Sequence, residues 1–268
     1  MTTELFDQEF QNCASQLKSY ILRITTSVPD AEDIMHDTYI KALDKLATFR
    51  SESSLKTWIF AIASNLAKDN LRVQKRWVEN VTDITKAAAL SNRPFFEKAM
   101  EIRTHSPQGQ YEAKEHIVLC FTCISKSLHL EQQLCIYLKE VYSFKVPDIA
   151  VILDTNEAMV KYYLYTGRSK MIDIYERRCA LINKNGVCHQ CSELNGIFNP
   201  KQNAQEELMK LDLVKQATNK DKEHLFDLRM KILQETDPFE SPAADLQLFH
   251  LEHNRQVMEK RMEATASW

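Results

Sequence analysis

Residues 146–171 read VPDIAVILDTNEAMVKYYLYTGRSKM, which is two helix-forming stretches separated by a polar turn. Residues 146–153 form the first stretch, 154–156 supply the turn and 157–171 form the second. The apolar side chains expected to face inward are Ile149, Ala150, Leu153, Val160 and Leu164. The small side chain of Ala150 allows the second helix to cross the first closely. This spacing is that of a helix-turn-helix.

The outward face of the second helix and the turn carry the candidate contacts to duplex DNA. Cations there can reach phosphates, and hydroxyl or amide groups can reach base edges in a major groove. The candidates are Thr155, Asn156, Lys161, Tyr162, Tyr165, Arg168 and Lys170. From these residues alone, a DNA-binding domain and an ordinary helical hairpin are both open.

The composition of the whole chain predicts an all-α protein. Only 4 of the 268 residues are glycine and 7 are proline, so tight turns are few. No apolar run approaches the roughly 20 residues that span a bilayer, and residues 1–10 do not have the pattern of a secretion signal. We therefore expect a cytoplasmic protein with no membrane insertion, whose 7 cysteines are reduced.

The charges are distributed unevenly along the chain. Residues 50–76 carry six Lys or Arg against two acidic residues, whereas residues 30–44 carry five acidic residues against one Lys. A basic segment suits phosphates and an acidic one suits a basic protein surface, although either is also compatible with a solvated helix face. The asymmetry suggests two different partners.

The apolar periodicity divides the chain into four parts. Residues 1–76 are expected to form a small bundle of about three helices, and residues 113–178 a second small bundle that contains the helix-turn-helix. Residues 77–112 are a linker with some helix near its middle, and residues 179–268 form a helical C-terminal extension. The Asp-Pro and Ser-Pro pairs at 237–242 interrupt that extension.

Two segments of the first bundle carry a family resemblance. Residues 30–49, beginning DAEDI, and residues 55–72, LKTWIFAIASNLAKDNLR, resemble the second conserved region of bacterial sigma factors. Residues 113–178 resemble their fourth region. The order and spacing resemble the extracytoplasmic-function (ECF) group, and the likeness covers about Phe6 to Ile174.

The resemblance implies an alternative sigma factor that binds core RNA polymerase, recognises promoter DNA and initiates transcription with strand opening. Such a protein is not an enzyme, and the sequence contains no Gly-rich phosphate loop, metalloprotease helix or nucleophile elbow. The partners that it implies are the β′ clamp helices and β flap of the polymerase, and promoter DNA in duplex and single-stranded form.

Particular residues inherit roles from the resemblance. The acidic helix would dock on the β′ clamp helices through Glu32, Asp33 and Asp37. The following helix would hold the non-template strand of the minus-ten element and capture an extruded base. The minus-ten candidates are Lys56, Asn65, Lys68, Asp69, Arg72, Lys75 and Arg76. Trp58 lies on the apolar face of its helix, so we assign it to the core rather than to base stacking.

The sequence departs from the family pattern at several positions. Non-arginine residues stand where the family often has arginine, namely Ala61, Ser64, Tyr163 and Thr166. Asp154 replaces the turn glycine, and Gly167 lies within the recognition helix, where glycine lowers helix stability. Fewer cations predict weaker phosphate contact and a shallower salt dependence.

The extension begins with a Cys/His cluster that has three open interpretations. Cys179, Cys188, His189 and Cys191 have the donor types of a zinc site, with His224 as an alternative fourth ligand. They could equally be structural thiols, or a redox-responsive pair. Zinc is the one cofactor that the sequence suggests. The turn at residues 184–186 is expected to bring Cys179 toward the other three.

Two other functions remain open besides the sigma factor. One is a helix-turn-helix regulator or adaptor that acts without polymerase and carries a zinc- or redox-responsive C-terminal module. The other is an interaction or sensing protein built around the Cys/His cluster and the extension. The sequence leaves open the promoter sequence, the regulon, the inducing signal, and whether an anti-sigma factor or the extension regulates the protein.

Overall fold

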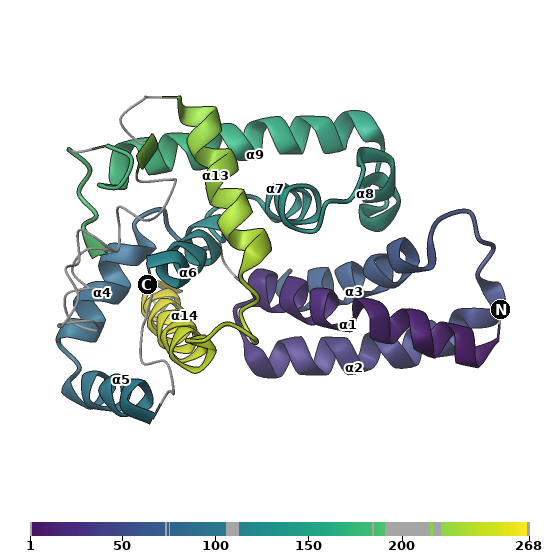
Figure 1. The fold of residues 1–268 in the computed structure, drawn as a ribbon, viewed down its shortest axis with the longest axis horizontal. Helices are drawn as coiled ribbons and strands as arrows, with labels where there is room; N and C mark the ends of the chain where they lie inside the picture. Colours follow the sequence, from purple (N-terminus) through teal and green to yellow (C-terminus); the bar gives the residue numbers. More distant parts are fainter. Residues whose placement is uncertain are drawn as a thin grey trace. The chain divides into compact units, whose positions relative to one another are not determined.

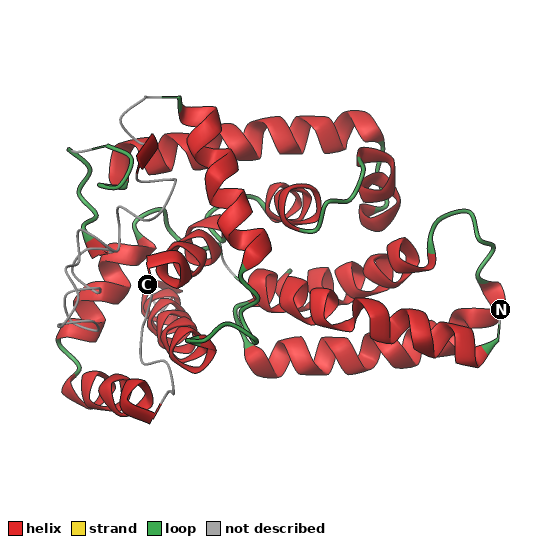
Figure 2. Cartoon of the chain, in the orientation of Figure 1, coloured by secondary structure: helices red, strands yellow, loops and turns green. Residues whose placement is uncertain are grey.

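A computed structural model describes residues 2–72, 74, 76–105, 113–183, 185–190, 215–216 and 221–266. Every named element in these ranges is a helix (Figures 1 and 2). The extended pairing found in them is an isolated parallel bridge between Cys179 and Cys188. The all-α fold class predicted from composition and periodicity is confirmed.

The chain divides into two compact units, each built from two separate stretches of sequence. Unit 1 contains residues 1–76 and 128–168, and unit 2 contains residues 77–127 and 169–268. Unit 1 thus groups the helix-turn-helix with the first bundle rather than with residues 113–127.

Unit 1 begins with three long helices, which are α1 (Thr3–Thr25), α2 (Val28–Lys45) and α3 (Leu55–Leu71). The 3₁₀ turn η1 (Leu46–Thr48) follows α2. Serine residues fix two of the helix starts, because the side chain of Ser27 accepts from the Asp30 amide at 3.2 Å and that of Ser54 from the Thr57 amide at 3.0 Å. Asp30 thus lies in the first turn, at the positive end of the helix dipole.

The rest of unit 1 is α7 (Leu130–Ile136), the π-helical segment η2 (Tyr137–Val141), α8 (Val146–Leu153) and the first part of α9 (Glu157–Arg178). Helix α3 packs against α1 and α2 on one side and against α8 on another. The core is apolar and aromatic, and its fully buried members include Phe6, Leu17, Tyr20, Ile24, Ile59, Phe60, Ile149 and Ile152. Unit 1 is therefore one core shared by both predicted bundles.

Unit 2 contains α4 (Val81–Leu90), α5 (Arg93–His105), α6 (Ala113–Ser125), the end of α9, α13 (Lys222–Glu235) and α14 (Ala244–Ala266). Helix α14 packs on α4, α5 and α6, and α13 packs on α6. The predicted linker is therefore largely helical, and the C-terminal extension folds together with it. The predicted interruption at residues 237–242 separates α13 from α14.

Aromatic and apolar contacts hold the extension against the linker helices. Phe95 of α5 stacks on Phe249 and on His253 of α14, with ring centroids 4.9 and 4.0 Å apart. Ile117 of α6 forms an apolar cluster with side chains of α13. Among the described helices, none combines the length and the apolar character that crossing a bilayer requires.

Candidate functional site

The helix-turn-helix has the predicted inward face and turn. Ile149 and Val160 are fully buried. Asp154 adopts the left-handed conformation with φ 52°, which Asp and Asn tolerate better than most residues. The amide of Thr155 then bonds to the carbonyl oxygen of Ala150 at 2.9 Å, and Asn156 caps α9 by accepting from the Met159 amide at 3.0 Å. Asp154 thus performs the role of the turn glycine that it replaces.

Gly167 is explained by the close approach of α9 to α7. A Cβ atom at this position would lie 2.9 Å from Cδ1 of Ile136 and 3.2 Å from Cβ of Gln132. Both distances are shorter than ordinary van der Waals contacts. The helix tolerates the glycine because a side chain there would separate the two helices.

The solvent face of the first part of α9 is aromatic rather than cationic. Tyr162 is 57% exposed and Tyr165 is 75% exposed. Lys161 is exposed beside them, with its Nζ atom 3.8 Å from a carboxylate oxygen of Glu157. Residues Thr155 and Asn156 lie at the turn, next to this face.

Two side chains that were predicted to contact duplex DNA have partners within the protein. Arg168 forms an ion pair of 2.8 Å with Glu140, and both side chains are largely buried. Lys170, in unit 2, donates to the backbone oxygen of Ser127 at 3.1 Å and lies 3.6 Å from Glu79. Both cations are therefore engaged by partners within the protein in this structure.

The predicted polymerase-docking residues form an exposed acidic face on α2. Glu32, Asp33 and Asp37 are all exposed, and Glu32 forms an exposed ion pair of 3.0 Å with Lys18. Ile40, one turn beyond Asp37, is 42% exposed. The face combines carboxylates with an apolar side chain, which is a composition suited to a basic protein surface.

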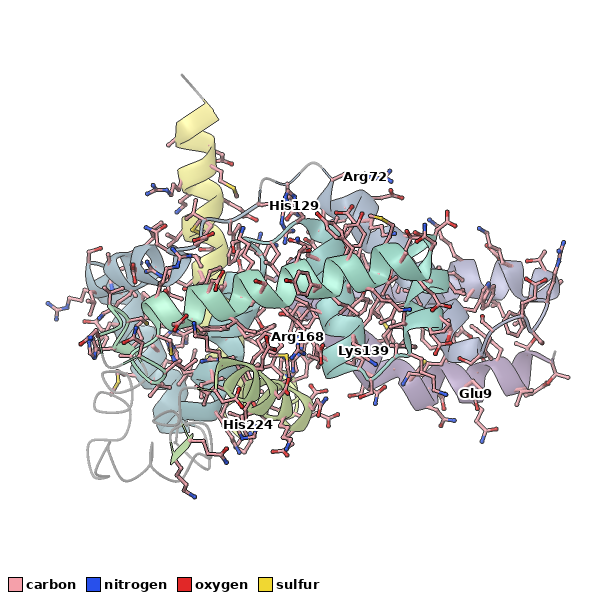
Figure 3. All side chains as sticks on the ribbon, turned by 90° about the horizontal axis from the view of Figure 1, so that it is seen from above. Glu9, Arg72, His129, Lys139, Arg168 and His224 are labelled. Carbon is pink, nitrogen blue, oxygen red and sulfur yellow. The ribbon has the colours of Figure 1, made fainter. Side chains whose placement is uncertain are left out.

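Three of the predicted minus-ten residues lie on the open side of α3. Asn65, Asp69 and Arg72 are exposed, and Arg72 extends into solvent at the end of the helix (Figure 3). Asp69 and Arg72 form an exposed ion pair of 3.1 Å, which contributes little to stability. Lys75 lies outside the described residues.

The three remaining predicted minus-ten cations contact other parts of unit 1. Lys56 lies 5.2 Å from the ring of Phe144, and Lys68 donates to the backbone oxygen of Leu153 at the end of α8 at 3.0 Å. Arg76 donates to the backbone oxygen of Leu128 at 2.7 Å and to the side chain of Gln133. Burial lowers the pKa of Lys68, and it lowers the pKa of Arg76 to about 10.

Aromatic contacts extend this cover over α3. The rings of Phe60 and Phe144 are 4.8 Å apart, and Tyr142 packs edge-on against Tyr20 at 5.6 Å. Thr57 lies 3.5 Å from the carboxylate of Asp148 in the first turn of α8. The segment that leads into the helix-turn-helix therefore covers part of the helix that was predicted to hold single-stranded DNA.

Two of the departures from the family pattern are internal polar contacts. Ser64 is buried and shares a hydrogen bond of 2.9 Å with the hydroxyl of Tyr20. Thr166 accepts from the side-chain amide of Gln132 at 2.9 Å. Trp58 is half-buried and packs against Phe49, with ring centroids 5.2 Å apart. It lies between the core position that we predicted and a solvent-facing one.

The Cys/His cluster is only partly described. The turn between Cys179 and Cys188 places these two residues opposite each other. The Cys188 amide donates to the backbone oxygen of Arg178, and the Ala180 amide donates to the backbone oxygen of Cys188. His189 is exposed, and Cys191 lies outside the described residues. His224 lies in the first turn of α13 and contacts Gln216. Within the described part of the chain, no group of three or more His, Cys, Asp or Glu side chains is placed to hold a metal ion.

Comparison with known proteins shows a family match in the N-terminal part of the chain. Residues 10–77 match the family Sigma-70 region 2. This part of the chain is similar to sigma-70 region 2. The matched residues contain all of α2 and α3, so they include both the exposed carboxylates and the partly covered DNA-binding candidates.

The curated relatives extend beyond region 2. RNA polymerase sigma factor YlaC of Bacillus subtilis is 26% identical over 170 residues, which are 63% of this chain and 88% of that protein. The ECF sigma-E factor of Haemophilus influenzae is also 26% identical over 170 residues, 61% of this chain and 82% of that protein. SigG of Mycobacterium tuberculosis is 23% identical over 181 residues, and the chain spans only 45% of its length.

A solved structure is also similar. The sigma factor RpoE from Bartonella quintana, crystallised with the anti-sigma factor NepR, is 18% identical with a TM-score of 0.44. The alignment covers 65% of this chain and 98% of that one.

The residues that cover α3 were not predicted from the sequence. Tyr142 and Phe144 flank Ser143, which has a φ of 60°, and this bend precedes α8. Two aromatic residues around a turn were a signal that the segment packs on something. No local signal indicates that the partner is α3, which lies more than 70 positions earlier in the chain.

Proposed function

We propose that this protein is an alternative sigma factor that binds core RNA polymerase, recognises promoter DNA and opens it for transcription initiation. The observation that carries the proposal is the region 2 domain with its acidic α2 face fully exposed. Its relatives, which include ECF sigma factors, support it. The role is one of recognition rather than catalysis.

The acidic face of α2 is the proposed docking surface for the β′ clamp helices. Asp33, Asp37 and Ile40 are spaced by four and three residues, so they lie along one side of the helix. Carboxylates facing a basic coiled coil raise the association rate and fix the register of docking. Ile40, exposed on the same side of the helix, would add a small apolar contact.

The proposed minus-ten surface is α3, and its use requires a change in unit 1. Lys56 and Lys68 can follow a phosphate backbone only after they leave Phe144 and the end of α8. Asn65 and Arg72 are exposed already. We infer that promoter opening by region 2 requires the separation of α8 from α3, and that the docked polymerase supplies the binding free energy for it.

The proposed minus-35 surface is the tyrosine face of α9. With Arg168 and Lys170 engaged elsewhere, Lys161 is the cation beside Tyr162 and Tyr165. Such a face makes few phosphate contacts and depends on base edges and thymine methyl groups. Binding to duplex DNA would therefore rely on polymerase tethering, and docking of this module on the β flap would provide the tether.

Reconstitution with core polymerase tests the proposal directly. We expect the chain to bind core and to yield promoter-dependent transcripts, and a chain that fails to bind core at all is not a sigma factor. The double variant Asp33→Lys/Asp37→Lys should weaken core binding by at least tenfold with an unchanged helical signal. A matched control reverses two exposed acidic residues of unit 2, Asp173 and Glu263, and should leave core affinity unchanged.

A helix-turn-helix regulator that works without polymerase is the second candidate. It is favoured by one observation, which is that Tyr162 and Tyr165 of α9 are exposed while α3 is partly covered. Under this hypothesis the isolated protein binds a specific duplex, and it has no affinity for core polymerase. Genomic fragments selected by the purified chain, with and without core, distinguish the two functions.

A further inference from the structure

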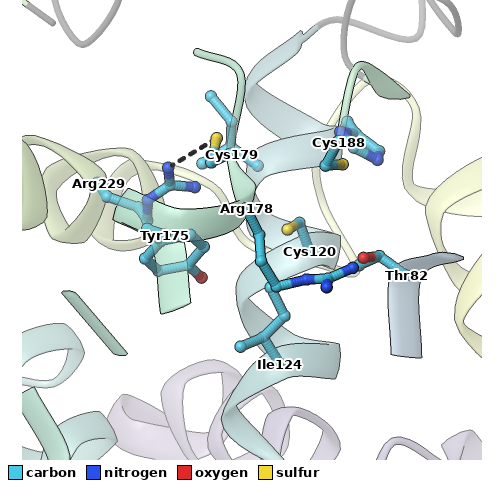
Figure 4. A pocket seen from close by; sticks show the side chains of 10 residues that line it. Thr82, Cys120, Ile124, Tyr175, Arg178, Cys179, Cys188 and Arg229 are labelled. Atoms are coloured by element: carbon cyan, nitrogen blue, oxygen red, sulfur yellow. Dashed lines mark hydrogen bonds between the residues drawn. The ribbon is translucent and has the colours of Figure 1, made fainter. Parts of the chain in front are cut away.

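A small cavity in unit 2 is lined by thiols and guanidinium groups (Figure 4). Its volume is about 20 Å³, which is room for about one water molecule. Cys120 of α6, Cys179 after the end of α9, Cys188 and Arg229 of α13 contribute to its wall. The size excludes an organic ligand, but it admits a reactant about as small as water.

Arg229 is the most unusual member of this wall. Its side chain is 1% exposed, and its guanidinium lies 3.7 Å from the ring centroid of Tyr175. It donates a hydrogen bond to the sulfur of Cys179 at 3.7 Å, and its buried Nε atom has no hydrogen-bond partner in the described ranges. Among the residues that the structure describes, no carboxylate pairs with it.

A buried cation needs a compensating anion. The polar side chain that contacts Arg229 is Cys179, whose sulfur accepts a hydrogen bond from the guanidinium. Cations near a cysteine favour its thiolate form, and the thiolate is the nucleophilic form of the residue. The contact between Arg229 and Cys179 therefore has the chemistry of a reactive thiol.

Cys188 lies where a second thiol could complete a disulfide. The backbone of Cys188 forms hydrogen bonds with the residues on both sides of Cys179. Its amide donates to the oxygen of Arg178 at 2.8 Å, and its oxygen accepts from the amide of Ala180 at 3.1 Å. Strands paired in this way are about 4.8 Å apart, which is within the range of roughly 4.4–6.8 Å between the Cα atoms of a disulfide. The Cys179 sulfur faces Arg229 in Figure 4, so the Cys179 side chain must turn about its Cα–Cβ bond to join Cys188.

The turn that positions Cys188 depends on Gly186. A Cβ atom there would lie 2.7 Å from the carbonyl carbon of Cys179 and 2.8 Å from the amide nitrogen of Ala180. Only a residue without a side chain lets the turn pack so closely on the bridge. The local sequence therefore keeps the two cysteines opposite each other.

We propose that Cys179 is a peroxide-reactive thiol, activated by Arg229, and that Cys188 resolves its oxidised form to a disulfide. This proposal does not depend on the sigma-factor function. It favours the redox interpretation of the Cys/His cluster over the zinc and structural ones, and it adds Arg229, which lies far outside the cluster in sequence.

The chemistry uses one molecule of hydrogen peroxide and two thiols. The Cys179 thiolate attacks one peroxide oxygen, the O–O bond breaks, and the departing hydroxide takes a proton to become water. The new S–O bond makes Cys179 a sulfenic acid. The sulfur of Cys188 then attacks the Cys179 sulfur, the S–S bond forms, and the S–O bond breaks. The released hydroxide takes the Cys188 proton, so that two thiols are oxidised and peroxide is reduced to two waters.

Oxidation has a structural consequence for α13. When the Cys179 sulfur turns toward Cys188 to form the disulfide, Arg229 loses that hydrogen-bond partner while it remains buried. The packing of α13 on α6 should then weaken, because an uncompensated buried charge is strongly destabilising. The site would thus convert a peroxide signal into loosening of the C-terminal extension.

Trapping of the sulfenic acid in the full chain tests the reactivity. In Cys188→Ser the sulfenic acid cannot be resolved, so dimedone should label Cys179 after peroxide treatment. Cys123 is the internal control, since burial raises its pKa to about 12 and should keep it unreactive. Adding Arg229→Met should slow the labelling of Cys179 about tenfold because it removes the cation that contacts the sulfur, whereas Arg229→Lys should slow it less. Equal labelling of Cys179 and Cys123, or an unchanged rate in Arg229→Met, overturns the proposal.

A second measurement covers the case in which the Arg229 variants fail to fold. Cys179→Asp places a permanent anion beside the guanidinium and should keep the urea midpoint of the wild type, whereas Cys179→Ala should lower it. A midpoint equal in both variants overturns the role of the anion.

Peptide mapping and metal analysis complete the test on the wild-type chain. After peroxide treatment the map should contain the Cys179–Cys188 disulfide, and pairing of Cys179 with Cys120 instead overturns the assignment of Cys188. One equivalent of zinc that protects both thiols from peroxide would also overturn the proposal.

Discussion

Replacing Gly167 by alanine measures how tightly α9 is held against α7. The added Cβ atom would lie 2.9 Å from the end of the Ile136 side chain and 3.2 Å from Cβ of Gln132. The first neighbour is flexible and can move, but the second is attached directly to the backbone of α7. The substitution must therefore push the two helices apart by a few tenths of an ångström or distort one of them.

Two opposing effects set the expected magnitude. Alanine in place of glycine inside a helix stabilises it by about 1 kcal/mol. Overpacking in a tight interface costs about 1–3 kcal/mol. We therefore expect Gly167→Ala to lower the free energy of unfolding of unit 1 by up to about 2 kcal/mol, so that the gain in helix propensity is cancelled or outweighed.

A double-mutant cycle with Ile136→Val isolates the contact. That change removes the nearest atom, and alone it should cost about 0.5–1.5 kcal/mol. In the Gly167→Ala background it should cost about 1 kcal/mol less, because it relieves the overlap. Urea unfolding followed by circular dichroism gives all four free energies. Ser169→Ala, at an exposed position two residues further along α9, is the control for helix propensity.

One outcome would exclude a packing role for Gly167. If Gly167→Ala stabilises the protein as much as helix propensity predicts, and if its effect adds to that of Ile136→Val, then α9 does not approach α7 closely. The glycine would then have no packing role.

Three further predictions concern other parts of the chain. Phe144→Ala removes an aromatic contact worth about 0.5–1.5 kcal/mol, so the isolated protein should bind a labelled single-stranded minus-ten oligonucleotide about 2- to 12-fold more tightly by fluorescence anisotropy. Burial lowers the pKa of His116 to about 4 and that of His250 to about 3, so the unfolded chain binds more protons below about pH 6.5. Unit 2 should keep its full stability above that pH and lose it progressively toward pH 4, as seen in urea midpoints. Ser54→Ala removes the cap of α3 and should cost about 1 kcal/mol in the same assay.

Each of these predictions has a result that contradicts it. Unchanged oligonucleotide affinity in Phe144→Ala would mean that the aromatic contact does not restrict α3. A pH dependence that persists unaltered in His116→Asn/His250→Asn would assign it to other groups. A loss in Ser53→Ala, the neighbouring control, equal to that in Ser54→Ala would exclude a capping effect.

The helices and their order were largely predictable from the sequence, because the apolar spacing and the breaks at Pro29 and residues 237–242 are local signals. The helix-turn-helix was predictable for the same reason, and Asp154 and Asn156 occupy the turn and cap positions expected of their side chains. The exposure of the acidic face on α2 followed from the positions of its buried neighbours Ala31, Ile34 and Thr38.

The grouping of helices into units was not predictable, because it depends on contacts between distant segments. The weak apolar spacing of residues 77–112 predicts a linker. In the structure α4 buries Val81, Thr82 and Thr85, α5 buries Phe95 and Ala99, and both helices pack against α14. The roles of Lys56, Lys68, Arg168 and Lys170 were missed for a related reason, because a long cation at a helix surface can reach solvent or a backbone oxygen equally well.

The division of each unit between two separate stretches of sequence affects how the chain is made. Residues 77–127 leave the ribosome well before the residues 169–268 against which they pack, and at about 5–20 residues per second the delay for those hundred residues is on the order of 5–20 s. During that time Phe95, Ile117 and Phe121 have no permanent neighbours, so the nascent chain exposes apolar side chains that chaperones can bind. A gene shortened before α13 would make this exposure permanent, and its product should accumulate in aggregates rather than as a smaller active protein.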